Sequence, residues 1–367
     1  MSRMPTSMPP KGLSSVDATF RSIQALRCVA ALLVVLFHAS THYSGEQTAA
    51  DHAPFYVGNV GVDIFFVISG FVMWTTTCRR QTPPAIFLQQ RFIRLVPIYW
   101  LFTVILFFVI DIFPHAFPRA AVTPVHLMLS LAFLPHMGPT GSIQPLLAQG
   151  WTLNFEMFFY AIFAAALTLT PPRRLLAVAV SLVALTCVGL AVSGAGITQD
   201  AQPWTILLSP LLLEFLGGIV LAWLVERGTW PAPIWCWAIL LCGVGVLSFE
   251  TLPQFDDDGQ RLLRYGGPAF LIVGGAVGAE LGGWLKVSRH LMLLGAASYS
   301  IYLTHTFVIS ALGKIAWVLG LGVLPLAVPV VASIVVGVAT YFVVERPLLA
   351  ALKSQPARPT AKSAMAR

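Results

Sequence analysis

A basic residue and a histidine lie eleven residues apart in the first strongly apolar segment of the chain, at Arg27 and His38. On an α-helix, eleven steps of roughly 100° return to within about 20° of the same face and rise roughly 16 Å. That rise is about half the hydrocarbon thickness of a bilayer. One helix would therefore hold a guanidinium at its entrance and an imidazole deep in the membrane, where ionisable groups are costly and usually functional.

Three carboxylates also fall inside apolar segments, at Asp63, Glu156 and Glu214. We expect Asp63 and Glu156 at a depth comparable to that of His38, with His305 of a later segment at a similar depth. A carboxylate there costs about 2.5–3.5 kcal/mol on insertion scales, so pairing with a histidine is expected. Such a pair raises the basicity of the free ring nitrogen, as general-base catalysis requires. For His305, a structural hydrogen bond is an equal alternative, and for Glu214 so is a helix-packing role.

The segment from Cys78 to Arg94 carries four arginines and no acidic residue. Arg91 and Arg94 are i,i+3 neighbours on one helix face, where like charges repel. Guanidinium groups without carboxylate partners suit the recognition of phosphate, although anchoring at lipid headgroups is the alternative. With Arg27 at the same end, the pattern predicts a phosphate-bearing donor whose far end reaches His38.

Membrane-spanning helices are needed to position these side chains, and the composition favours them. The 367 residues are 57% hydrophobic and 10% charged, with a mean hydropathy of +0.80, whereas a soluble domain carries about 25% charged residues. The sequence predicts an all-α polytopic membrane protein of about ten spans. A piece from Val125 to Met137 is expected to be re-entrant or interfacial. The expected spans are 24–41, 57–77, 95–113, 151–169, 175–193, 204–225, 232–249, 263–282, 291–311 and 323–343.

The loop charges predict an orientation in which both termini are cytoplasmic. With the N-terminus inside, only Arg119, Arg261, Arg264 and Lys314 of the 22 Lys and Arg fall outside, which is a strong positive-inside bias. We expect a cytoplasmic tail over 1–20, a transmembrane domain over 21–347 and a disordered basic tail over 348–367.

Cysteine, glycine and charge patterns argue against other kinds of site. The five cysteines form no CxxC pair and lie in or beside apolar segments, so neither a disulfide framework nor a metal site is expected. No glycine array has the P-loop or dinucleotide-binding form. The net charge of +7 is concentrated in the inner loops, so it does not indicate a nucleic-acid partner. We expect no metal and no resident cofactor.

Six motifs, in order along the chain, resemble those of the membrane acyltransferase 3 family, and together they cover about Arg21 to Pro347. A run from Gly70 to Trp74 and the compact length are similar to the branch that acetylates bacterial exopolysaccharides. The fourth motif departs mildly, with Thr and Asn where Ser often appears. The six motifs are Arg27 followed by His38 after ten residues, Gly61–Phe71, Arg91–Trp100, Trp151–Glu156, Ser298–His305 and Glu345–Pro347.

The resemblance implies transfer of an acyl group, usually acetyl from acetyl-CoA, to a carbohydrate hydroxyl. It also implies that His38 is catalytic and that Arg27, Arg91 and Arg94 help to bind the donor. Some relatives carry a further C-terminal SGNH-type domain. Here we expect the acceptor to be handled by the membrane portion or by a partner.

We therefore expect an O-acyltransferase of the bacterial inner membrane that uses cytoplasmic acyl-CoA as co-substrate. Its acceptor would be a polysaccharide or glycolipid, free or lipid-linked, and its further partners the bilayer and polysaccharide biosynthesis machinery. His38 would act as general base or as a transient acyl carrier, and either Asp63 or Glu156 would orient it. Candidates for acceptor or oxyanion contacts are Ser69, Trp151, Tyr302 and His305.

Two other function classes remain open at this point. Buried histidines and carboxylates also form the proton relays of transporters. Against that class, the sequence has no visible inverted repeat, and the outer-half site pairs with an inner anion patch. A non-catalytic component of a polysaccharide export complex is the second alternative.

Overall fold

The computed structural model describes residues 20–43, 55–78, 82–117, 121–193, 202–250 and 257–353. Within these ranges the regular elements are all helices, so the all-α prediction is confirmed. In chain order they are α1 (Arg21–Tyr43), η2 (Tyr56–Asn59), α2 (Val60–Thr77), α3 (Pro84–Ile112), η3 (Pro114–Ala116), α4 (Pro124–Leu131), α5 (Gly150–Ala166), α6 (Pro171–Ser193), η4 (Pro203–Leu208), α7 (Leu212–Glu226), α8 (Pro233–Ser248), α9 (Asp258–Arg261), η5 (Leu262–Gly266), α10 (Gly267–Leu281), α11 (Arg289–Ala296), α12 (Ser298–Val318), α13 (Ala327–Thr340), η6 (Tyr341–Glu345) and α14 (Arg346–Lys353).

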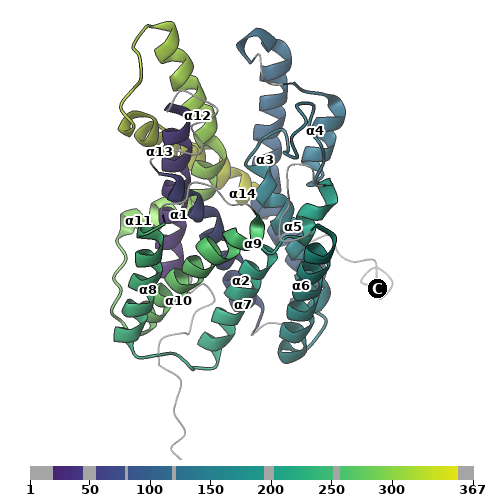
Figure 1. Cartoon of the computed structure of the whole chain (residues 1–367), viewed down its shortest axis with the longest axis vertical. Helices are drawn as coiled ribbons and strands as arrows, with labels where there is room; N and C mark the ends of the chain where they lie inside the picture. Colours follow the sequence, from purple (N-terminus) through teal and green to yellow (C-terminus); the bar gives the residue numbers. More distant parts are fainter. Residues whose placement is uncertain are drawn as a thin grey trace, which may run out of the picture.

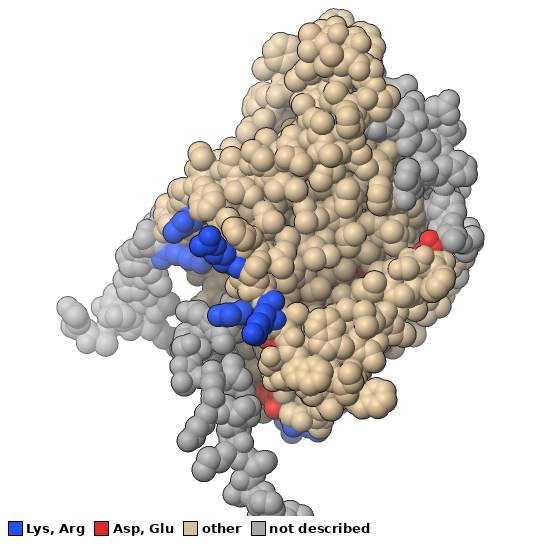
Figure 2. All heavy atoms as spheres, turned by 90° about the vertical axis from the view of Figure 1, so that its left-hand side faces the viewer, with Lys and Arg blue, Asp and Glu red and all other residues tan. Residues whose placement is uncertain are grey.

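Eight helical stretches in the described ranges are long and apolar enough to cross a membrane. Two further apolar helices are shorter, α5 with 17 residues and α8 with 16. Each of the ten expected segments thus coincides with a helix, and the chain is a multi-pass membrane protein. The face seen in Figure 2 is largely uncharged, with its Lys and Arg side chains in a few places in the lower half of the view, as lipid contact requires. The side on which the termini lie stays a prediction.

In the C-terminal part of the chain, two helix boundaries differ from the expected ones. The expected span 291–311 is interrupted at Ala297, so the long helix there is α12. The last span continues through η6 into α14, which ends at Lys353, so the expected domain limit at Pro347 falls inside a helix. Residues 1–19 and 354–367, which make up most of the two expected tails, lie outside the described residues.

The Val125–Met137 piece holds a helix that is too short to cross a bilayer, and its re-entrant or interfacial placement stays a prediction. The helix in this segment, α4, has 8 residues, and a helix of that length rises about 12 Å, less than half of a bilayer core. Thr123 caps it by accepting a hydrogen bond from the backbone N–H of His126 at 3.1 Å.

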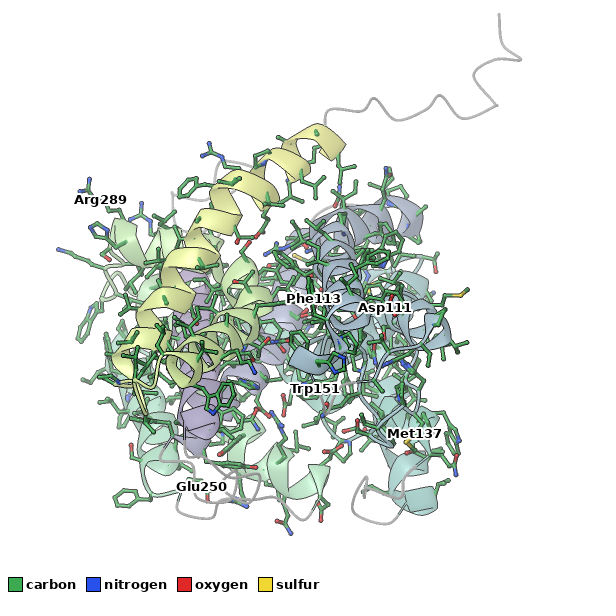
Figure 3. All side chains as sticks on the ribbon, turned by 90° about the horizontal axis from the view of Figure 1, so that it is seen from above. Asp111, Phe113, Met137, Trp151, Glu250 and Arg289 are labelled. Carbon is green, nitrogen blue, oxygen red and sulfur yellow. The ribbon has the colours of Figure 1, made fainter. Side chains whose placement is uncertain are left out.

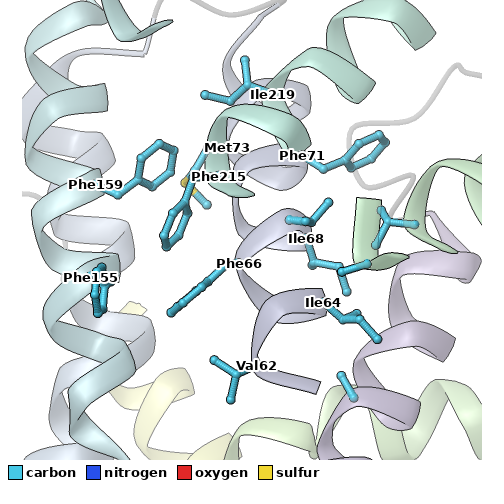
Figure 4. Close-up of a cluster of buried hydrophobic side chains, with 14 of the residues drawn as sticks. Val62, Ile64, Phe66, Ile68, Phe71, Met73, Phe155, Phe159, Phe215 and Ile219 are labelled. Atoms are coloured by element: carbon cyan, nitrogen blue, oxygen red, sulfur yellow. The ribbon is translucent and has the colours of Figure 1, made fainter. Parts of the chain in front are cut away.

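The core centres on α2, whose side chains are almost all buried. Phe66 of α2 and Phe159 of α5 both pack against Phe215 of α7, with ring centroids 4.7 and 4.4 Å apart, respectively (Figure 4). This aromatic cluster fixes α2, which carries Asp63 and Ser69, and α5, which carries Glu156, relative to each other and to α7.

Helices α2 and α7 also touch through their backbones, because glycine replaces a side chain on each. A Cβ added at Gly70 would lie 1.9 Å from the carbonyl oxygen of Phe215. One added at Gly218 would lie 1.9 Å from the carbonyl oxygen of Val67. Small residues allow such close approach between membrane helices.

Antiparallel neighbours give the bundle two distinct ends. Near the start of α3, Arg91 donates a hydrogen bond to the Thr76 hydroxyl at the end of α2. Trp74 of α2 donates to Glu226, the last residue of α7. We call this the arginine end. In Figure 1, α12 and α13 lie on the left of the upper half and α3 and α4 on the right.

At the opposite end, the starts of several helices meet. Arg261 of α9 donates a hydrogen bond to the backbone carbonyl of Asn59, just before α2. Its guanidinium lies 5.5 Å from the ring of Trp151, in the first turn of α5. We call this the tryptophan end. Because α1 runs from the arginine end toward it, Arg27 lies nearer the first end and His38 nearer the second.

Candidate functional site

A cavity opens between α1, α2, α3, α5 and α12 on the side of the arginine end. It holds about 730 Å³ of space, its open mouth included. Aliphatic and aromatic side chains form most of its wall. We call it the arginine cavity, and its polar and ionisable lining residues are Arg27, Ser69, Arg91, Arg94, Thr152, Glu156, Tyr160, Ser298, Tyr299 and Tyr302.

The structure brings together the three arginines that sequence reasoning assigned to a donor site. Among the described residues, neither ion pair of the fold involves Arg27, Arg91 or Arg94. Arg27 Nε donates a hydrogen bond to Ser298 at 3.2 Å. Arg91 is buried, yet its Nε has no hydrogen-bond partner. Because an unpaired buried donor is costly, these groups favour an anionic ligand in the cavity.

Glu156 belongs to the arginine cavity and not to His38. Its carboxylate accepts a hydrogen bond from the Tyr160 hydroxyl and interacts electrostatically with all three arginines, most strongly with Arg94. Cationic partners stabilise a carboxylate more than a neutral imidazole does. The expectation that Glu156 orients His38 is therefore corrected, and the residue lies among the proposed donor contacts.

Asp63 also has a partner other than His38. It is completely buried and forms a two-point ion pair with Arg261, with Nε–Oδ1 3.0 Å and Nη2–Oδ2 2.9 Å. This geometry satisfies both carboxylate oxygens with a permanent charge. The expectation that Asp63 orients His38 is likewise corrected.

His38 lies beside another histidine. Its Nδ1 is 3.0 Å from the carbonyl oxygen of Val34. Because a carbonyl only accepts, we assign the proton of the neutral ring to Nδ1, which leaves the lone pair on Nε2. The ring centroid is 4.9 Å from that of His305, with the planes at 60°. The expected depth match of these two histidines agrees with this contact.

His305 has the same assigned tautomer and is fully buried. Its Nδ1 lies 2.7 Å from the carbonyl oxygen of Tyr302, and its Nε2 is buried without a hydrogen-bond partner. An unpaired acceptor of this kind is available for a proton or for a hydroxyl group of a ligand.

Tyr302 connects the arginine cavity with the histidine pair. Its side chain lines the cavity, and its ring centroid is 5.9 Å from that of His305. The Tyr302 hydroxyl lies 3.1 Å from the hydroxyl of Thr152. The two histidines themselves are not part of the cavity wall, so Tyr302 separates them from it.

Ser69 is placed differently from Tyr302, the other candidate oxyanion donor. The Ser69 hydroxyl is 3.5 Å from the hydroxyl of Tyr160, so Ser69 is grouped with Glu156 and the arginines. The structure does not bring it to His38 in any contact of the described residues. The oxyanion roles of Ser69 and Tyr302 stay predictions.

Trp151 lines a second cavity, at the tryptophan end. This cavity holds about 740 Å³ of space, its open mouth included. Seen from above, Trp151 lies near the middle of the molecule, while Arg289 and Glu250 lie at its periphery (Figure 3). We call this the tryptophan cavity, and its polar and aromatic lining residues are His136, Gln144, Trp151, Asn154, Phe155, Asp258 and Arg261.

One wall of the tryptophan cavity is the loop between α4 and α5. His126 of α4 fastens this loop, since its Nε2 lies 3.3 Å from the carbonyl oxygen of Gln144. Its ring also packs on that of His136 at 5.0 Å. Partial burial lowers the pKa of His126, although the Gln144 carbonyl opposes this. This shift favours the neutral form of the His126 imidazole.

Sequence reasoning missed the lining of the tryptophan cavity except for Trp151. Arg261 was counted only as an outer-loop cation, although an arginine at the start of an apolar segment needs an internal partner. The sequence spacing of Asn154 and His136 does not indicate a shared site, because the folding of the loop before α5 brings them together. In the described ranges, no cluster of three or more His, Cys, Asp or Glu side chains could hold a metal ion.

Comparison with known proteins agrees with the motifs. A family model described as an acyltransferase domain, that of the acyltransferase 3 family, matches residues 20–344. The exopolysaccharide production protein ExoZ of Rhizobium meliloti (strain 1021) is 38% identical over 320 residues, covering 86% of this chain and 94% of its own. Acyltransferase MdmB of Streptomyces mycarofaciens is 30% identical over 315 residues, covering 78% of each chain. No solved structure matches the chain significantly.

The family match spans nearly the whole described bundle, including both cavities and the histidine pair. The alignment with ExoZ likewise covers most of both chains. The chain therefore belongs to the acyltransferase 3 family and is a multi-pass membrane acyltransferase.

Proposed function

We propose that the chain transfers an acyl group, acetyl in the first instance, from cytoplasmic acyl-CoA to a hydroxyl of an exported polysaccharide or glycolipid, in a bacterial inner membrane. The name of the relative ExoZ supports a polysaccharide acceptor. The observation that carries the proposal is the convergence of three guanidinium groups on a cavity that ends at Tyr302, next to the histidine pair.

The arginine cavity suits coenzyme A in its charge and in its apolar lining. Phosphate oxygens are good acceptors for guanidinium groups, and Arg91 Nε is a buried donor still lacking a partner. Beyond the arginines the wall is apolar and includes Phe65, Phe66 and Ile68. An extended pantetheine arm could lie along this wall and bring the thioester toward Tyr302.

His38 is the proposed general base. With Nδ1–H held by the Val34 carbonyl, its Nε2 can take the proton of the acceptor hydroxyl as that oxygen attacks the thioester carbonyl carbon. The new C–O bond forms, the C–S bond breaks, and the CoA thiolate takes the proton back from Nε2. The alternative, in which Nε2 itself carries the acyl group for one step, uses the same tautomer. The Tyr302 hydroxyl is the candidate donor to the oxyanion.

The Val34 carbonyl takes the place that a carboxylate would have beside this base. The His305 ring packs against that of His38 and holds it in position, and its buried Nε2 is an acceptor still without a partner. Asp63 and Glu156 are each engaged elsewhere. Among the described residues, no chain of carboxylates leads to His38, which argues against a proton-relay transporter.

Arg94→Ala tests the donor site. Losing one charge-assisted hydrogen bond costs about 1.5–3 kcal/mol, so the KM for acetyl-CoA should rise about 10- to 100-fold, while the acceptor KM stays near that of the wild type. Arg94→Lys should recover part of the loss, since it restores the charge without the planar fork. The measurement is the initial rate of labelled acetyl transfer in membranes across a series of acetyl-CoA concentrations.

The matched control for Arg94→Ala is Arg289→Ala, an exposed arginine of α11 at the periphery. It should leave both KM values unchanged. The acceptor is the oligosaccharide mixture from deacetylated exopolysaccharide of the producing strain. A raised acceptor KM with an unchanged donor KM in Arg94→Ala would contradict the donor assignment.

A further inference from the structure

The tryptophan cavity contains buried polar atoms that no other residue satisfies. Asn154 is 4% exposed and its Oδ1 has no hydrogen-bond partner, and His136 is 8% exposed and its Nε2 has none. Both residues line the cavity. Such an atom costs about 1–3 kcal/mol when left unpaired, and folded proteins keep few of them. Two in one cavity wall therefore point to a polar ligand.

Trp151 adds an aromatic wall to these polar groups. The indole is half-buried and packs edge-on against Phe155 and Phe66, with ring centroids 5.9 and 6.3 Å away. Both neighbours belong to the rigid aromatic core. A fixed aromatic surface beside unpaired polar groups suits a sugar ring, whose C–H faces are apolar and whose edge carries hydroxyls.

The charges of the cavity favour an uncharged ligand. Arg261 is its one cationic lining residue among the described residues, and it interacts with Asp63, Glu214 and Asp258. These carboxylates offset the guanidinium, so the cavity has no excess positive charge with which to attract an anionic sugar. Asp258 accepts a hydrogen bond from Ser209 at 2.6 Å. This bond holds the Asp258 carboxylate, which can accept further hydrogen bonds, at the cavity edge.

The first turns of α5 separate this cavity from the arginine cavity. Trp151 and Asn154 line the tryptophan cavity, whereas Thr152 and Leu153 line the arginine cavity. Successive residues of a helix point in different directions, so one short stretch forms a wall of both. A ligand in each cavity would lie on either side of the same helical turn.

We propose that the tryptophan cavity is the acceptor site and binds an uncharged sugar unit of the glycan, with Trp151 as the stacking surface and Asn154 and His136 as hydrogen-bond partners. This inference rests on the proposed function. Asp63 has a positioning role here, because its two-point ion pair holds Arg261 at the cavity wall beside Trp151.

Binding to the purified full-length protein in detergent tests the site directly. The probes are the neutral and the acidic oligosaccharides obtained by partial hydrolysis of the producing strain's deacetylated exopolysaccharide. Their binding is measured by saturation-transfer NMR. The neutral fraction should bind to the wild type, about tenfold or more weakly to Asn154→Leu, and with partial loss to Trp151→Phe. Trp235→Ala, which removes an exposed tryptophan of α8, should bind like the wild type.

Failure of the neutral fraction to bind to the wild type, or tighter binding of the acidic fraction, would overturn the inference. Equal binding by the wild type and by both Trp151→Phe and Asn154→Leu, each shown to be folded by an unchanged thermal transition, would overturn it too. Two variants of different chemistry keep the test decisive if one of them does not fold.

The transfer assay separates this inference from the proposed function. Asn154→Leu should raise the acceptor KM about tenfold or more and leave the acetyl-CoA KM unchanged. If transfer occurs but only the donor KM changes, the acceptor assignment fails and the proposed function stands. The opposite outcome is that neither the wild type nor any variant transfers acetyl, while the neutral fraction still binds through Trp151 and Asn154. In that case the proposed function fails and the glycan site stands.

Discussion

The proposed base, His38, lies against the ring of a second histidine and not beside a carboxylate. The ring of His305 can orient the His38 imidazole, whereas a carboxylate would also stabilise the imidazolium by attraction. His305 therefore assists the step that protonates His38 and has no contact with the arginines proposed to bind the donor. Its loss should change the chemical step alone.

His305→Ala should lower kcat by about 10²-fold, within the range for losing a group that assists proton transfer, and should leave both KM values near those of the wild type. The measurement is the steady-state rate with each substrate varied in turn. His290→Ala, an exposed histidine of α11, is the matched control and should keep the wild-type kcat. An unchanged kcat in His305→Ala would show that the contact between the two rings has no part in catalysis.

Helix periodicity predicts which residues of one helix share a face, but it does not predict contacts between separate helices. Arg27 and His38 lie on one helix, so their spacing alone places them on one face. The partner of Asp63 could not be found in this way. Arg261 is 198 positions away in sequence, and which face of α2 meets it depends on how separate helices pack. His38 lies at a similar depth but is not the partner of Asp63, because Arg261, far away in sequence, pairs with that carboxylate.

Among the elements, the ion pair between Asp63 and Arg261 joins α2 to α9 at the wall of the tryptophan cavity. Both side chains are buried. Removing one charge leaves the other without its main partner inside the protein, which is far more costly than removing both. The second ion pair, Arg264 with Glu250, is less buried and should matter less.

Asp63→Asn and Arg261→Met should each lower the thermal transition of the purified protein. The double variant should be clearly more stable than the sum of the two losses predicts, with a coupling of about 1–3 kcal/mol. The same cycle with Glu250→Gln and Arg264→Met serves as the control and should give a smaller coupling. Additive losses at Asp63 and Arg261 would contradict the pairing.

Helix positions were predicted better than helix ends. Hydropathy identifies every long apolar segment, because crossing a bilayer requires about twenty apolar residues. It does not detect the break at Ala297, since α11 and α12 are both apolar on either side of it. Nor does it detect the continuation into α14, an amphipathic helix of mixed composition that ends at Lys353.

For the whole molecule, the two cavities lie toward opposite ends of the bundle, with the first turns of α5 between them. The charge bias of the loops predicts that the arginine end faces the cytoplasm. A donor would enter there, and an acceptor unit would be held on the other side of the first turns of α5. The composition predicted the membrane class, but the second cavity required the folded chain.

The central claim is that His38 carries out acyl transfer from acyl-CoA to a glycan. The most direct test supplies labelled acetyl-CoA to the cytoplasmic face of inside-out membrane vesicles and measures label in the glycan. The account predicts incorporation with the wild type and with His290→Ala, and a fall of about 10²- to 10⁴-fold with His38→Ala. Undiminished glycan acetylation by His38→Ala would contradict it.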